Sequence, residues 1–210
     1  MNLSGLEPTQ AIHVENGPSW WPISELKHFG ESARIRRLVL AWAAVLAIAV
    51  LSGVLNVTLG WNGVPLSLFG IPFSVTVYPA FVLSVLVALW LGPTWGALPI
   101  YLANFASGLA SGLPWTMSAL FAVAGVVETL ILWGSLAALR LDPDLRRIRD
   151  TLWFAAAGTV AAVTGSLGAI LWNNSHEFTP SQGLAIWRGW VIGDLLMLLV
   201  LVMPLLRLLG

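Results

Sequence analysis

Two carboxylic acids lie inside long apolar segments of this sequence. Glu128 stands in the middle of the segment 117–139, and Asp194 stands one to two helical turns from the start of the segment 189–208. A carboxylate at bilayer depth costs at least ~2.5–3.5 kcal/mol, so such residues face the interior of a helix bundle and usually have a partner there. Asn104 lies at a similar depth in an earlier apolar segment. We therefore expect these three polar side chains to point inward.

Helical spacing groups polar and aromatic residues on common faces. Trp187, Trp190 and Asp194 stand at positions i, i+3 and i+7, so they share one face of a helix. Small or polar residues form similar stripes in three other segments, at Ser118, Ala122, Gly125 and Glu128, at Asn104, Gly108 and Ser111, and at Gly158, Ala162, Gly165 and Ala169. These faces predict a polar pocket that opens to the outside, with a candidate ligand-binding set of Tyr78, Asn104, Glu128, Trp187, Trp190 and Asp194.

Two interpretations of this set stay open. Aromatic rings exclude water, and the low dielectric around them strengthens polar contacts, so the set suits a cationic or hydrogen-bonding ligand. In the alternative, Glu128, Asn104 and Asp194 only hydrogen-bond to neighbouring helices and hold the bundle together. Asp194 would then pair with Arg188 or with a neighbouring helix and fix the end of its segment.

Other chemistry finds little support in the residues. Cysteine is absent, no HExxH motif occurs, and no glycine-rich phosphate loop precedes a lysine. An intramembrane aspartyl protease needs two aspartates that share a proton, whereas Asp194 is the only aspartate in the interior of an apolar segment. The three histidines lie outside the apolar segments, which argues against a haem. We therefore expect no enzymatic activity, no catalytic residue, no metal and no cofactor, and the net charge of zero offers no basic surface for nucleic acid.

Composition places most of the chain in lipid. Of its 210 residues, 58% are hydrophobic and only 10% are charged, whereas a soluble domain has roughly a quarter charged residues. A helix needs about 20 apolar residues to cross the hydrocarbon of a bilayer. The sequence predicts an all-α, polytopic transmembrane bundle of about six spans, placed at 37–57, 73–91, 95–112, 117–139, 150–172 and 189–208. The short apolar stretch 64–72 would add a re-entrant or interfacial piece to this count.

Basic residues predict the orientation, because Lys and Arg stay on the cytoplasmic side of membrane spans. With six spans and the N-terminus inside, only Arg188 faces out, and nine of the ten Lys and Arg lie in the cytoplasm: Lys27, Arg34, Arg36, Arg37, Arg140, Arg146, Arg147, Arg149 and Arg207. Both termini are therefore expected to be cytoplasmic. Residues 1–34 are expected to form a tail or an interfacial helix, and residues 35–210 the transmembrane domain.

The stretch from about Tyr78 to Pro204 resembles a bacterial integral membrane sensor domain called MASE1. The residues that carry the resemblance are Tyr78-Pro79, the run Tyr101-Leu102-Ala103-Asn104-Phe105, Glu128 with the apolar run to Leu139-Arg140, and Trp187-Arg188-Gly189-Trp190 leading to Gly193-Asp194 and Pro204. Similar proteins carry this module before histidine kinase, diguanylate cyclase or phosphatase domains. The resemblance implies a multi-pass protein of the bacterial inner membrane, with a signalling output domain on the cytoplasmic side.

The expected function is that of a non-enzymatic sensory module. A small ligand or a partner would bind among the helices and shift the last helix, which would signal to a cytoplasmic output domain or a partner membrane protein. The main alternative is a small transporter or the substrate-binding subunit of an importer, which Ala43 and Ala47 on the first helix would suit; a purely structural assembly protein is a third. The GxxxG pattern from Gly108 to Gly112 indicates packing within the bundle, with a homodimer as the other reading.

Overall fold

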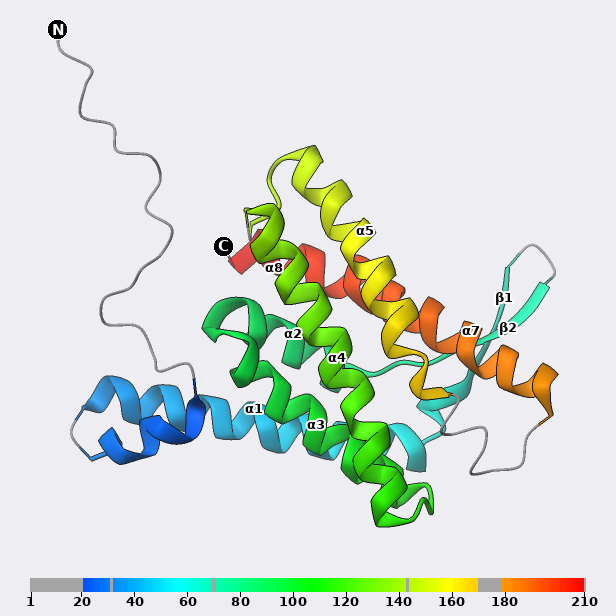
Figure 1. Ribbon diagram of the computed structural model, residues 1–210, viewed down its shortest axis with the longest axis horizontal. Coiled ribbons are helices and arrows are strands. Elements are labelled where there is room, and N and C mark those ends of the chain that lie inside the picture. The colour runs from blue at the N-terminus through cyan, green and yellow to red at the C-terminus, as the bar shows by residue number, and fades with distance from the viewer. Residues whose placement is uncertain (1–20, 31, 69–70, 143, 170–178, 210) are drawn as a thin grey trace, which may run out of the picture.

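Helices make up nearly all of the fold (Figure 1). The computed structural model describes residues 21–30, 32–68, 71–142, 144–169 and 179–209. The helices are α1 (Ala33–Thr58), α2 (Pro79–Leu91), α3 (Pro93–Ala110), α4 (Trp115–Leu139), α5 (Ile148–Gly165), α7 (Pro180–Leu196) and α8 (Met203–Leu209). Short 3-10 helices occupy Pro22–His28 and Trp61–Gly63, a π-helical segment at Met197–Val202 joins α7 to α8, and two antiparallel strands, β1 (Val64–Leu68) and β2 (Ile71–Val75), form a hairpin.

Three helices in the described part of the chain are long and apolar enough to cross a membrane. They are α1, α4 and the continuous helix Pro180–Leu208. The prediction of about six spans is supported for these three only. The other helices fall short for visible reasons: α2 has 13 residues, α3 contains Pro99 and Asn104, and α5 carries Arg149 and Asp150 in its first turn. Residues 170–172 of the fifth predicted span lie outside the described residues.

The hairpin corrects the start of the second predicted span. Residues 73–75 belong to β2, and α2 begins only at Pro79, so the helical segment is shorter than the predicted 73–91. The apolar stretch 64–72, expected to be re-entrant or interfacial, supplies β1 and the start of β2 instead. Register pairs Val64 with Val75 at the base of the hairpin. A hydrogen bond of 2.9 Å from the Val77 amide to the Trp61 carbonyl closes that base.

Helix α2 is the innermost helix of the bundle. Eight of its 13 residues are buried, and they cover all sides of the helix rather than one stripe. A helix that is hydrophobic all round is stable only when neighbouring helices enclose it. Its Phe81 and Val85 lie in one apolar core with Ile100 of α3, Leu132 of α4 and Phe154 of α5. This central position explains how so short a helix is held in place.

Small residues allow the other helices to approach α3 closely. A Cβ atom at Gly53 of α1 would collide with the backbone of Ala103, and one at Gly108 of α3 would lie 2.8 Å from Ser118 Oγ of α4. Glycine at these positions therefore lets both α1 and α4 pack closely against α3. The prediction that Gly108 serves packing within the bundle agrees with this contact.

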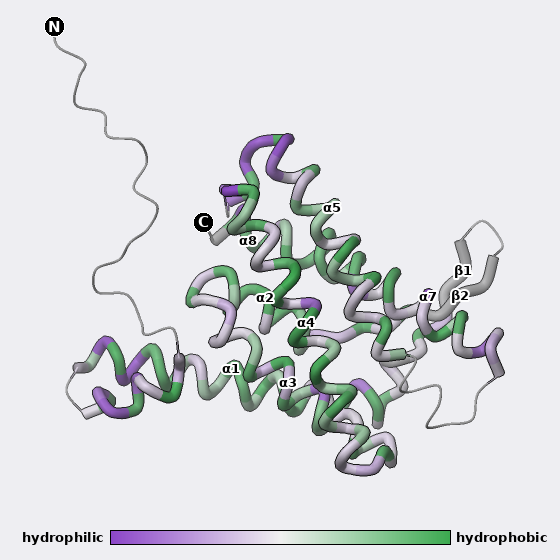
Figure 2. Tube along the Cα trace, in the orientation of Figure 1, coloured by the Kyte–Doolittle hydropathy of each residue, from purple (hydrophilic) through white to green (hydrophobic). Residues whose placement is uncertain are grey.

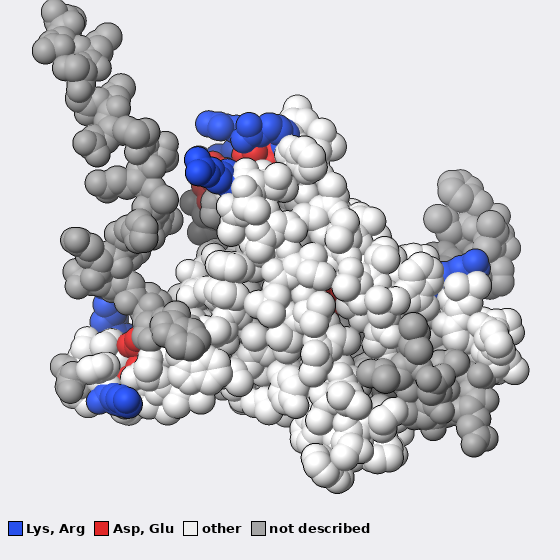
Figure 3. Space-filling view, viewed as in Figure 1, with Lys and Arg blue, Asp and Glu red and all other residues white. Residues whose placement is uncertain are grey.

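Apolar side chains cover the outside of the molecule. On α4, Leu120, Val123, Val127 and Leu130 are each at least 36% exposed and lie on the face away from Glu128. Figure 2 shows hydrophobic residues along the whole length of the helices, and Figure 3 shows Lys and Arg gathered at the start of α1 and around the α4–α5 loop, with an almost uncharged surface between them. Soluble proteins rarely expose such extended apolar surface. The distribution fits association with a membrane.

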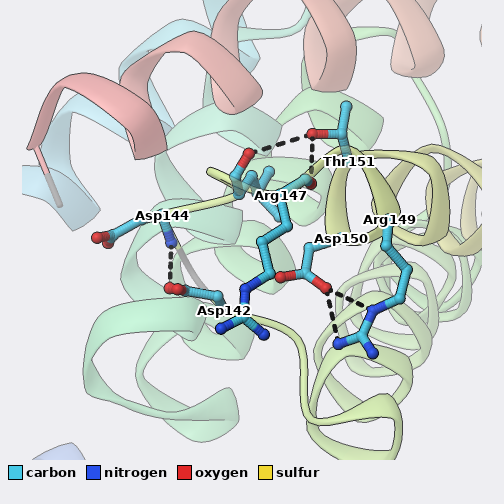
Figure 4. A network of polar contacts seen from close by, with 7 residues as sticks. Asp142, Asp144, Arg147, Arg149, Asp150 and Thr151 are labelled. Atoms are coloured by element: carbon cyan, nitrogen blue, oxygen red, sulfur yellow. Dashed lines mark hydrogen bonds and ion pairs between the residues drawn. The ribbon is translucent and has the colours of Figure 1, made fainter.

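The α4–α5 loop carries a network of polar contacts (Figure 4). The Arg149 guanidinium lies 3.1 Å from a carboxylate oxygen of Asp150, a residue that is only 1% exposed. Arg207 of α8 donates from Nη2 to Thr151 Oγ1 at 2.7 Å and from Nε to the Leu145 carbonyl at 3.3 Å. Arg207 therefore holds α8 to this loop and to the first turn of α5.

Candidate ligand-binding cavity

A cavity of about 300 Å³ lies between the base of the hairpin and helices α3, α4, α5 and α7. Each of these elements contributes side chains to the wall, as do the end of α1 and the start of α2. The lining residues are Asn56, Val57, Gly63, Thr76, Tyr78, Phe81, Ile100, Asn104, Ser107, Phe121, Ala124, Gly125, Glu128, Gly165, Ser166, Ile186, Trp190 and Asp194. Cavities of this size hold small organic ligands in other proteins.

Five of the six residues predicted from the sequence line this cavity: Tyr78, Asn104, Glu128, Trp190 and Asp194. The prediction that the polar residues at membrane depth point inward is confirmed, because Asn104 is 7%, Glu128 4% and Asp194 9% exposed. The structure thus brings together residues from three helices and from the residue that precedes α2, up to 116 positions apart in the chain from Tyr78 to Asp194.

Trp187 is the exception, because it does not line the cavity. An α-helix turns by about 100° per residue, so residues three apart diverge by about 60° around its axis. The face of α7 that reaches the cavity carries Ile186, Trp190 and Asp194, which stand four residues apart. Trp187 lies beside this face with its indole nitrogen buried and without a hydrogen-bond partner. The face of α7 that lines the cavity is therefore rotated about the helix axis, by part of a turn, from the face predicted for Trp187, Trp190 and Asp194.

Two glycines position the acid and the amide of the cavity wall. A Cβ atom on Gly165 of α5 would fall on the Glu128 side chain, and one on Gly125 of α4 would fall on the Asn104 amide. Glu128 therefore lies flat against α5, and Asn104 lies flat against α4. One carboxylate oxygen of Glu128, Oε1, is buried and has no hydrogen-bond partner among the described residues.

The base of the hairpin forms the wall nearest to α7. Asn56, near the end of α1, donates from Nδ2 to the Val77 carbonyl at 2.7 Å and so holds the chain that leads into α2. Tyr78 follows directly; its side chain is 9% exposed, and its hydroxyl is buried without a hydrogen-bond partner in the described structure. On α7, Gly193 packs directly on the backbone of Thr76. This contact places the next residue, Asp194, at the cavity.

Aromatic rings line the side of the cavity toward α7. The rings of Phe121 and Trp190 meet edge to face, with centroids 5.6 Å apart and planes at 60°. Phe81 of α2 adds a third ring to the lining. The cavity thus combines apolar ring surfaces with the carboxylates of Glu128 and Asp194, and its described lining contains no Lys, Arg or His.

Sequence reasoning missed several lining residues, among them Asn56, Thr76, Phe121, Ser166 and Ile186. Asn56 could have been predicted to face the interior, because an amide near the end of a long apolar helix is costly to expose to lipid. Phe121 and Ile186 could not, since apolar residues are common on every face of these helices.

Comparison with family models, with curated proteins and with solved structures finds no match for this chain. The resemblance to MASE1 sensor domains therefore remains an expectation from the residues quoted for it. The geometry of the cavity is an independent starting point for the function.

Proposed function

We propose that this protein is a membrane-embedded sensory module that binds a small ligand between its helices. The observation that carries the proposal is the gathering of Asn104, Glu128, Trp190 and Asp194 around one cavity, inside a molecule whose outside is apolar. Buried acids at membrane depth mark ligand or ion sites more often than they serve packing alone. The resemblance to MASE1 supports a role in signalling rather than in catalysis.

The last helix offers a route for the signal. Asp194 lies at the cavity, the π-helical segment begins three residues later at Met197, and α8 follows with Arg207 bound to the α4–α5 loop and to the start of α5. π-helical turns are uncommon and occur frequently at functional sites. In the proposal, an occupied cavity changes the packing of α7, and the π-helical segment passes the change to α8 and to an output domain or partner protein.

The proposed topology has six spans, with both termini in the cytoplasm of a bacterial cell. The two groups of basic residues, at the start of α1 and in the α4–α5 loop, then lie on the same side as Arg207. We expect alkaline phosphatase fused after Gly210 to be inactive and a cytoplasm-active fluorescent fusion at the same site to be bright. Strong phosphatase activity at this fusion point would contradict the proposed orientation.

Filling the cavity tests ligand binding directly. Ile186 lines the cavity from α7 and is only partly buried, so tryptophan at this position adds bulk to the cavity without removing a polar group. A mixed library of small molecules would be screened by tryptophan-fluorescence melting of the full chain in detergent. We expect some compounds to raise the melting temperature of the wild type and to lose this effect in Ile186→Trp. Stabilising compounds that act equally on both proteins would contradict binding in the cavity.

A substrate-binding subunit of an importer is the second candidate, and one observation favours it. Ala43 and Ala47 stand one turn apart on α1 and are both exposed, so this helix offers a smooth surface to a partner helix. Genes for an ATPase and a coupling protein beside this gene would support the importer. A cytoplasmic kinase, cyclase or phosphatase domain encoded with it would support the sensor.

A further inference from the structure

We infer that the cavity binds a small organic ammonium ion. The inference rests on the proposed function, because it names the chemical class of ligand for the same cavity. The observations that carry it are a pair of carboxylates from two helices, unpartnered buried oxygen atoms on two residues that line the cavity, and a wall of aromatic rings.

The first observation is the balance of charge in the cavity. Glu128 enters from α4 and Asp194 from α7, and Asp194 is near enough to act electrostatically on both Glu128 and the Tyr78 hydroxyl. The basic residue nearest in sequence, Arg188 on α7, is exposed and does not line the cavity. Two acids in a site of low dielectric are both stable as carboxylates only when a positive charge lies nearby. Since the described lining supplies none, the ligand is the group that would bring it.

The second observation is the state of the polar atoms. Glu128 Oε1 and the Tyr78 hydroxyl are buried, and neither has a hydrogen-bond partner in the described part of the chain. Buried oxygen atoms of this kind are rarely left without a partner in folded proteins. Glu128 Oε1 can accept a hydrogen bond from an N–H donor, and the Tyr78 oxygen can accept one as well. A primary ammonium group satisfies both requirements through its N–H donors, whereas a quaternary ammonium supplies only the charge and an anion would add to the repulsion.

The third observation is the wall and the size of the cavity. Phe81, Phe121 and Trp190 present rings to a space of about 300 Å³, which is far larger than a bare metal ion. Aromatic faces attract ammonium groups by the cation–π interaction, most strongly where water is excluded. The combination therefore favours an organic cation with an apolar part over a sodium ion. Sharing of one proton between the two carboxylates is the competing arrangement, and it would favour a neutral ligand.

The test uses a matched pair of probes that differ in charge alone. Choline is a small quaternary ammonium ion, and the dimethylbutanol in which carbon replaces its nitrogen has the same shape without the charge. Melting of the purified full chain would be followed with each probe at millimolar concentration, with sodium chloride at equal ionic strength. A primary amine, butylammonium, would be measured alongside. We expect the ammonium ions to raise the melting temperature and the neutral isostere and sodium chloride to have no comparable effect.

Variants connect the effect to the two acids. We expect Glu128→Gln and Asp194→Asn each to weaken choline binding by about tenfold or more, because each removes a carboxylate whose negative charge attracts the cation. Asp150→Asn is the matched control, since Asp150 is also buried but pairs with Arg149 in the first turn of α5 and does not line the cavity. It should leave choline binding unchanged.

The outcomes separate this inference from the proposed function. If the neutral isostere stabilises the wild type as well as choline does, and Ile186→Trp abolishes both effects, the ammonium assignment is wrong while the cavity remains a binding site. If neither ammonium ion stabilises the wild type, or sodium chloride alone reproduces the effect, the inference is also wrong. If choline stabilises Ile186→Trp and the wild type equally, the cavity itself is not the binding site and both proposals fail. Because the comparison of probes needs only the wild type, it does not depend on whether a variant folds.

Discussion

Asparagine in place of Asp194 is expected to abolish signalling while the bundle stays folded. Asn keeps the size of the side chain and one acceptor oxygen but removes the charge at the cavity. Loss of a charge-assisted contact costs about 1.5–3 kcal/mol, which corresponds to about a 10- to 100-fold loss of affinity. With a diguanylate cyclase domain fused after Gly210, the ligand-dependent change in cyclase activity should disappear. Expression and melting temperature should stay close to those of the wild-type fusion.

The matched control again uses the other buried aspartate. Asp150→Asn removes a carboxylate that is 1% exposed and bound to Arg149, so it should lower stability and leave the response of each folded molecule intact. A purely structural role for Asp194 would give the same result at both positions, namely less folded protein with a response in proportion to it. That result for Asp194→Asn would sink the signalling role.

The polar part of the cavity could be predicted because exposing a carboxylate or an amide to lipid costs free energy. Lipid offers no partner to a carboxylate or an amide, so Asn104, Glu128 and Asp194 had to face the interior wherever the helices were placed. The stripe of Ser118, Ala122, Gly125 and Glu128 was expected to be buried because helical spacing places these residues on one face with the acid. All four are buried. The approach of Asn104 to Gly125 shows how one stripe supports the other.

The hairpin and the rotation of α7 could not be predicted in the same way. The stretch 64–75 is short and apolar, and the periodicity of such a run does not distinguish a strand from a buried helix. On α7, residues at spacings of three and four both lie near one face, so the sequence left the choice between Trp187 and Ile186 open. Packing against Thr76 decides it, because Gly193 fixes how the helix is turned.

Alanine in place of Gly193 is expected to destabilise the protein and to disturb the cavity at the same time. The added Cβ atom would fall on the backbone of Thr76, with the Thr76 nitrogen at 3.0 Å. Backbone cannot move aside as a flexible side chain does, so α7 itself would have to shift. Overpacking of this kind costs about 1–3 kcal/mol, which should lower the melting temperature by roughly 3–10 °C. Because Asp194 and Trp190 move with the helix, stabilisation by ligand should fall as well.

Gly134→Ala provides the matched control for this change. Gly134 is also inside a long helix, α4, but a Cβ atom there meets nothing within 4 Å. Alanine is a better helix former than glycine by about 1 kcal/mol, so this variant should melt at the wild-type temperature or slightly above it and should keep its ligand response. The two substitutions add the same methyl group, and only the contact with Thr76 differs. If Gly193→Ala melted and bound ligand as Gly134→Ala does, the close contact of α7 with the base of the hairpin would not be what holds Asp194 at the cavity.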